Sequence, residues 1–121
     1  MSRILTAALL AGVSLAASSS ALAHAMLDGA IPAVGSTVAP TDTISLRYTE
    51  GIEPHFSSVT VAIDGGAVLP AARPDVDPAD RRILVLHLAA PLPAGHYRVE
   101  WRVVSVDSHR TEGGFTFTVA P

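Results

Sequence analysis

The stretch Tyr97-Arg98-Val99-Glu100-Trp101-Arg102-Val103 alternates apolar and charged side chains along its whole length. Successive side chains of a β-strand point to opposite faces of the sheet, so this two-residue period predicts a strand. Its aromatic and valine side chains would be buried, and its arginines and glutamate would face solvent. Such a strand belongs to a sheet whose apolar face packs against a second layer.

Similar patterns recur along the chain, separated by turns rich in proline and glycine. We expect four further strands, each with three apolar side chains on one face: 43–49 (Ile44, Leu46, Tyr48), 57–63 (Val59, Val61, Ile63), 82–88 (Leu84, Leu86, Leu88) and 113–119 (Phe115, Phe117, Val119). Residues 27–36 predict a short edge strand followed by a loop, 38–42 and 64–66 predict turns, and 70–80 predict a solvated loop. Short strands at near-regular spacing, without a sustained helical period, predict an all-β fold, a small sandwich or Greek-key β-barrel.

Residues 1–23 have the features of a secretory signal peptide. Arg3 supplies a positive start, an apolar run covers 4–17, and Ala21-Leu22-Ala23 is a typical cleavage site. The alternative is an uncleaved N-terminal anchor. Cleavage after Ala23 would make His24 the first residue of a single domain, 24–121, and would give one residue both an α-amine and an imidazole.

Composition excludes several classes of function. The chain has a net charge of −3, its eight basic residues are all arginine, and they form no basic run. We therefore expect no nucleic-acid partner. There is no cysteine, which excludes both disulfides and a thiolate metal site.

A possible metal site follows the strand expected at 97–103, at Asp107-Ser108-His109. If the chain stays extended, residues 107 and 109 point to the same side, and a carboxylate and an imidazole together could hold a metal ion. The alternative is that Asp107 caps a turn, which is a common use of aspartate.

The chain resembles the CopC family of periplasmic copper-binding proteins. The resemblance covers essentially the whole of 24–121 and depends on His24-Ala-Met-Leu-Asp-Gly at the start, Leu46-Arg-Tyr-Thr-Glu50, Pro93-Ala-Gly-His-Tyr-Arg-Val-Glu-Trp101 continuing to Asp107-Ser-His109, and Gly114-Phe-Thr-Phe. It implies a Greek-key β-barrel of cupredoxin- or immunoglobulin-like shape and one Cu(II) ion. It also implies a ligand set of the amine and imidazole of His24, a carboxylate oxygen of Asp107 and an imidazole nitrogen of His109. Glu50 matches an acidic residue near that site, as a weak ligand or a neighbour of the ligands. A membrane protein of the CopD type is a frequent companion in the family.

The chemistry of this ligand set agrees with copper. Three nitrogens and one oxygen in a tetragonal arrangement suit Cu(II); Ni(II) is the main competitor, and Zn(II) prefers a tetrahedral site. The best-known members also carry a methionine-rich loop with a histidine that holds Cu(I). Here residues 63–80 contain neither methionine nor histidine, so the chain resembles a Cu(II)-only branch.

The leading interpretation is a periplasmic Cu(II) carrier or buffer in copper resistance, homeostasis or delivery, without catalytic activity. One alternative is an oxygenase-like enzyme with a histidine brace, although an aspartate ligand would occupy a position that oxygen chemistry needs. Another is an immunoglobulin-like interaction module without metal, with His24 an unliganded terminus. Of the remaining histidines, His55 is expected at the surface or at an end of the barrel, and His87 and His96 are expected to face solvent or to have their hydrogen bonds satisfied, rather than to bind metal.

Overall fold

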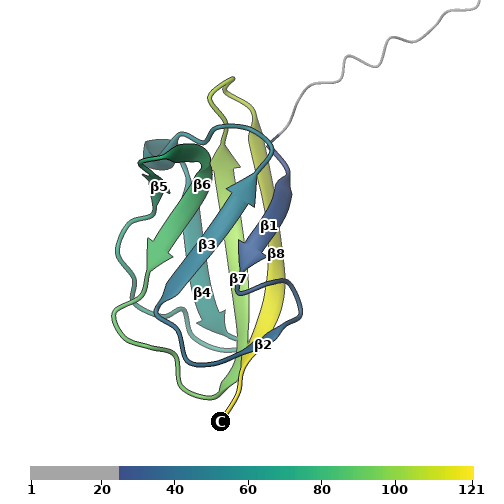
Figure 1. The fold of residues 1–121 in the computed structure, drawn as a ribbon, viewed down its shortest axis with the longest axis vertical. Helices are drawn as coiled ribbons and strands as arrows, with labels where there is room; N and C mark the ends of the chain where they lie inside the picture. The colour runs from purple at the N-terminus through teal and green to yellow at the C-terminus, as the bar shows by residue number, and fades with distance from the viewer. Residues whose placement is uncertain (1–24) are drawn as a thin grey trace, which may run out of the picture.

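Two four-stranded β-sheets pack face to face in the computed structural model, which describes residues 25–121. The elements are β1 (Leu27–Ile31), β2 (Thr37–Val38), β3 (Thr43–Tyr48), the short 3-10 helix η1 (Pro54–Phe56), β4 (Ser58–Ile63), β5 (Asp75–Asp77), β6 (Asp80–His87), β7 (Gly95–Val104) and β8 (Arg110–Val119). One sheet has the order β1-β3-β6-β5 and the other β2-β8-β7-β4. All pairs are antiparallel except β2 with β8 (Figure 1). Residues 25–121 contain no helix that could span a lipid bilayer.

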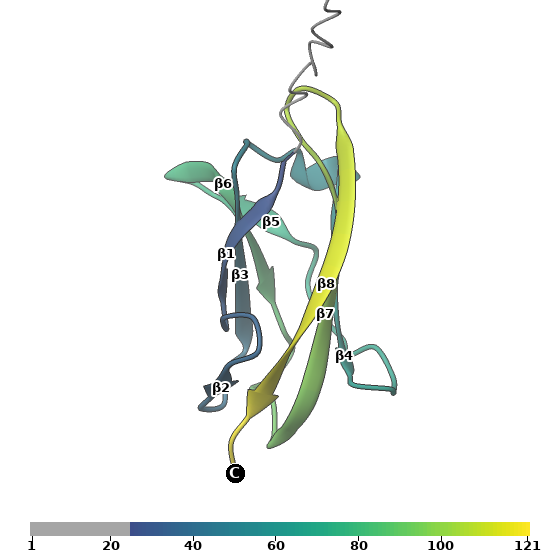
Figure 2. The same cartoon turned by 90° about the vertical axis from the view of Figure 1, so that its right-hand side faces the viewer.

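The all-β expectation is therefore confirmed, in its sandwich form. Figure 2 shows the two layers edge-on, with β1, β3, β5 and β6 on one side and β4, β7 and β8 on the other. The longest pairing joins β7 to β8 from Gly95↔Val119 to Val104↔Arg110. Because β7 also pairs with β4, it lies inside its sheet with one face towards the other layer.

The core contains the inward faces of both sheets. Most side chains expected from the two-residue period are buried, namely Ile44, Leu46, Tyr48, Val59, Val61, Leu84, Leu86, Leu88, Tyr97, Val99, Trp101, Val103, Phe115, Phe117 and Val119. Ile63 is an exception, because it is 49% exposed. It ends β4 just before the turn at 64–66, where no opposing layer covers it.

Two expectations about loops were wrong in part. Residues 70–80 include a short strand, β5, which pairs with β6 at the edge of the sheet. The turn expected at 38–42 begins one residue late, because Thr37 and Val38 pair with the end of β8. Such short edge strands carry too few residues for a readable period.

Trp101 of β7 contacts the opposite layer of the core. Its ring meets that of Tyr48 edge-on, with ring centroids 5.2 Å apart, and it lies against Gly113, its partner across the β7–β8 pair. A Cβ atom at Gly113 would lie 2.5 Å from Cζ2 of the indole. The core position of Trp101 expected from the two-residue period is confirmed. Its indole N–H has no hydrogen-bond partner among residues 25–121.

We predict that Gly113→Ala destabilises the protein by about 1–3 kcal/mol, because the added methyl group must displace a buried ring. Urea unfolding of the processed protein measures the effect. Thr116→Ala, at an exposed position of the same strand, is the control and should change stability by less than about 0.5 kcal/mol. Equal stability of Gly113→Ala and the unmodified protein would show that the indole can move aside.

Candidate metal centre

The connection between β7 and β8 is a tight turn at the end of the molecule drawn uppermost in Figure 1. The N–H of Ser105 donates to the carbonyl of His109 at 2.9 Å, and the N–H of Ser108 donates to the carbonyl of Ser105 at 2.8 Å. Ser108 has a φ of 71°, in the left-handed region that single turn residues adopt. The chain is therefore not extended at 107–109, and that part of the sequence argument was wrong.

The turn nevertheless brings the expected pair together. Nδ1 of His109 lies 3.1 Å from Oδ2 of Asp107, and the two side chains are 35% and 39% exposed. The pKa of Asp107 lies below its usual value because the Ser105 hydroxyl donates to the carboxylate and, second, because of the His109 side chain. Asp107 is thus anionic at neutral pH and suited to a cation. Asp107 also takes part in the turn through its contact with Ser105, as the turn interpretation expected, and its role as a metal ligand stays a prediction.

The first described residues of the chain are held at the same end of the sandwich. The carbonyl of the buried Ala25 accepts a hydrogen bond from Oγ1 of Thr111 at 2.8 Å. Met26 is joined to Thr49 in both directions, its N–H donating to Oγ1 at 3.0 Å and its carbonyl accepting from the Thr49 N–H at 2.9 Å. Thr111 is two residues beyond His109. The candidate ligand His24 lies outside the described residues.

Glu50 follows directly after this anchor and is half-buried. The next residue, Gly51, accepts a hydrogen bond from the N–H of Val106 at 2.9 Å, which ties this segment to the β7–β8 turn. No group of three or more histidine, aspartate or glutamate side chains among residues 25–121 is arranged to hold a metal ion. Glu50 therefore does not complete a three-residue cluster with Asp107 and His109 in this structure.

The remaining three histidines lie away from this turn or face solvent. His55 is exposed on η1, and His87 is exposed at the end of β6. His96 is exposed at the start of β7, where its Nδ1 lies 2.9 Å from Oγ1 of Thr118. This distribution agrees with the solvent-facing roles expected from the sequence.

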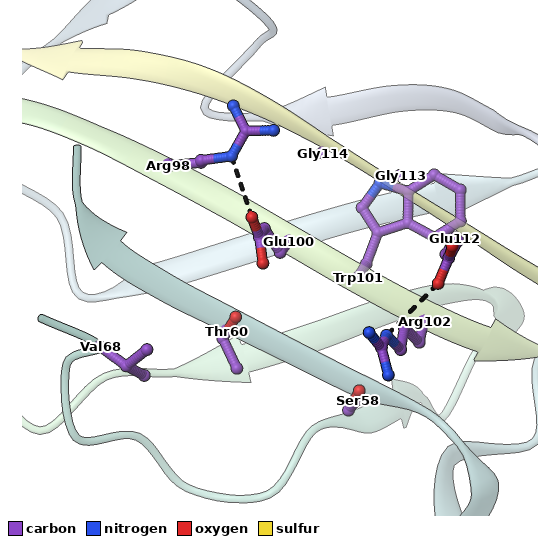
Figure 3. Close-up of a pocket in the computed structure, with 10 residues that line it drawn as sticks. All are labelled: Ser58, Thr60, Val68, Arg98, Glu100, Trp101, Arg102, Glu112, Gly113 and Gly114. Carbon is purple, nitrogen blue, oxygen red and sulfur yellow. Dashed lines mark hydrogen bonds and ion pairs between the residues drawn. The ribbon is translucent and has the colours of Figure 1, made fainter. Parts of the chain in front are cut away.

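A hollow with a volume of about 680 Å³ lies on the outer face of the β4–β7–β8 sheet (Figure 3). Its charged groups satisfy one another, Arg98 with Glu100 at 3.0 Å and Arg102 with Glu112 at 3.4 Å. None of the residues that line it is a histidine. It is therefore separate from the Asp107–His109 pair.

Comparison with known proteins identifies the family. A family model described as the CopC domain matches residues 27–120. The chain belongs to the CopC family. The copper resistance protein C of Escherichia coli is 37% identical over 122 aligned positions, which cover 96% of this chain and 94% of that protein.

Solved structures of CopC proteins have the same fold. CopC from Methylosinus trichosporium OB3b superposes with a TM-score of 0.74 at 32% identity, covering 81% of this chain and 95% of that one. PcoC, a methionine-rich copper resistance protein from Escherichia coli, gives a TM-score of 0.68 at 37% identity, covering 81% and 100%. The family membership expected from the sequence is confirmed.

Three residues that shape this end of the protein were not predicted from the sequence: Thr49, Ser105 and Thr111. Ser105 left a readable signal, because it follows Trp101 and Val103 at the same parity and is a polar residue where the pattern predicts an apolar one. The two threonines left none, since a threonine in a strand is ordinary.

We predict that Thr111→Val loosens the first residues of the domain, because valine keeps the shape of threonine but cannot donate to the Ala25 carbonyl. Losing a hydrogen bond of about 1 kcal/mol corresponds to about fivefold faster opening. Hydrogen exchange at the Met26 amide measures it, with Thr60→Val on the outer face of β4 as the control. Unchanged exchange at Met26 would argue that Thr111 is not an anchor.

Proposed function

We propose that this protein is a periplasmic Cu(II) carrier or buffer that acts in copper resistance, homeostasis or delivery. Each chain would take one ion as cargo after removal of the signal peptide, 1–23. The observation that carries the proposal is the Asp107–His109 pair, held 3.1 Å apart on a turn beside the anchored start of the domain. The names of the relatives and the family membership support the assignment to copper.

The donor set suits Cu(II) more than other divalent ions. Asp107 would supply a carboxylate oxygen, His109 an imidazole nitrogen, and His24 its α-amine and imidazole. Three nitrogens and one oxygen match the tetragonal preference of Cu(II), which also binds most tightly among the first-row divalent ions. One carboxylate leaves a positive charge on the complex, and Glu50 would reduce it from nearby.

Partial exposure of the pair supports a carrier. Side chains about one third exposed remain open to an exchanging partner, whereas a buried site would hold the ion for longer. The family resemblance adds a membrane protein of the CopD type as the proposed recipient or donor. Two relatives from Escherichia coli, the copper resistance protein C and PcoC, are named for copper resistance, and no observation favours the oxygenase alternative.

We predict that one extra residue before His24 lowers Cu(II) affinity by at least about a hundredfold. The amine of His24 then becomes an amide nitrogen, its chelate ring with the imidazole is lost, and each tenfold in affinity corresponds to about 1.4 kcal/mol. Competition with a copper chelator at one pH compares the two forms. Equal Cu(II) affinities of the two forms would show that the amine is not a ligand. As a control, the unfolding curves of the two metal-free forms should coincide, because the added residue lies outside the core.

We also predict that His109→Ala weakens Cu(II) binding as much as the extended N-terminus does, and that Asp107→Ala weakens it less. Each change removes one proposed donor atom. His87→Ala removes an exposed histidine at the end of β6 and should leave the affinity unchanged. A His109→Ala protein that binds as the unmodified one does would place the copper elsewhere.

We predict no tight Cu(I) site. Thioether sulfur is the soft ligand that Cu(I) prefers, and the chain has two methionines, one of them in the proposed signal peptide. Under reducing conditions a Cu(I) chelator should remove the metal completely. Retention of Cu(I) against that chelator would overturn the assignment to a Cu(II)-only branch.

A further inference from the structure

Ser105 has an unusual position for a serine. It is fully buried, at 0% exposure, and it continues the inward face of β7 beyond Trp101 and Val103. A buried hydroxyl without a hydrogen bond costs about 1–3 kcal/mol in proteins. The Ser105 hydroxyl is therefore expected to have a hydrogen-bond partner inside the protein.

Within residues 25–121, all the hydrogen bonds of Ser105 go to the turn that carries the candidate ligands. Its hydroxyl donates to Oδ1 of Asp107, and the same oxygen lies 3.4 Å from the carbonyl of His109. A hydroxyl has one proton, and the closer acceptor, the carboxylate, receives it. The main chain of Ser105 adds the bonds to His109 and Ser108 described above.

The segment on the other side holds Ser105 in place. Ser105 forms an isolated antiparallel bridge with the buried Ile52. On either side of that bridge, the Glu53 N–H donates to the Val104 carbonyl at 2.8 Å and the Val106 N–H donates to the Gly51 carbonyl at 2.9 Å. The main chain on both sides of Ser105 is thus held by hydrogen bonds, whereas the Asp107 side chain is partly exposed to solvent.

We propose that Ser105 is a positioning residue for copper, whose hydroxyl holds the Asp107 carboxylate beside His109 before the ion arrives. This inference rests on the proposed function. Free aspartate side chains rotate among several rotamers, and ordering them on binding lowers affinity. Because the hydroxyl fixes the Asp107 carboxylate when the protein folds, the loss of rotamer freedom does not lower the affinity for copper. Copper then binds a preformed pair.

Two serines at this end of the protein allow a matched test. Ser105→Ala removes the bond to Asp107. Ser57→Ala is the control, because the Ser57 hydroxyl also makes two hydrogen bonds to main-chain groups. It donates to the Glu53 carbonyl at 2.8 Å and accepts from the Val104 N–H at 3.0 Å, and neither bond involves Asp107 or His109. Cu(II) affinity is measured by chelator competition on the processed proteins, and the carboxyl ¹³C resonance of Asp107 by NMR on the metal-free proteins.

We expect Ser105→Ala to lower Cu(II) affinity by about ten- to hundredfold, the usual range for a residue that orients a metal ligand, and to move the Asp107 resonance. Ser57→Ala should change neither. If Ser105 acts through Asp107, the same substitution should cost nothing further in an Asp107→Ala background, as a double-mutant cycle reports. Ser105→Thr, which keeps the hydroxyl, should restore the affinity and the resonance.

Other results would overturn the inference in distinguishable ways. Equal affinity losses in Ser105→Ala and Ser57→Ala would show that general loosening is responsible. If Ser105→Ala leaves the Cu(II) affinity unchanged while Asp107→Ala lowers it, Asp107 belongs to the copper site and Ser105 does not contribute to it. Equal binding by the unmodified and Asp107→Ala proteins would remove Asp107 from the site, and the inference about Ser105 with it.

Discussion

The long antiparallel pairing of β7 with β8 is the constraint on which the rest of the structure depends. Ten residue pairs, from Gly95↔Val119 to Val104↔Arg110, set which side chains face inward on both strands. A register shift of one residue would turn all of them to the opposite face. The same pairing aligns Trp101 with Gly113, and at its far end it determines where the chain must reverse, at 105–109.

The two-residue period predicted the strands well where they are long and lie against the opposite layer. It was less successful at the margins. Ile63 obeys the period yet is exposed, because period reports the face of a strand and not whether another layer covers that position. β5 was missed because three residues between prolines show no periodicity, and its pairing with β6 is a tertiary effect.

The sequence predicted that Asp107 and His109 lie close together, but not the local geometry that brings them there. Asp107 and His109 are brought together, yet by a turn with Ser108 in a left-handed conformation, where an extended chain had been expected. Serine has no strong preference for that conformation, so the local sequence carries no clear sign of it. Anchoring of the chain start by Thr49 and Thr111 depends on contacts between residues far apart in the sequence, which a single sequence does not reveal.

The first described residues are attached to both layers of the sandwich. Met26 is bonded to Thr49, which directly follows β3 in one sheet, and Ala25 is bonded to Thr111 of β8 in the other. An ion held between this segment and the β7–β8 turn would act as a cross-link that the unfolded chain cannot retain. Binding to the native state alone raises stability with the logarithm of free ligand concentration. The lifetime of the protein would then follow the supply of its own cargo, with empty molecules opening and being degraded first.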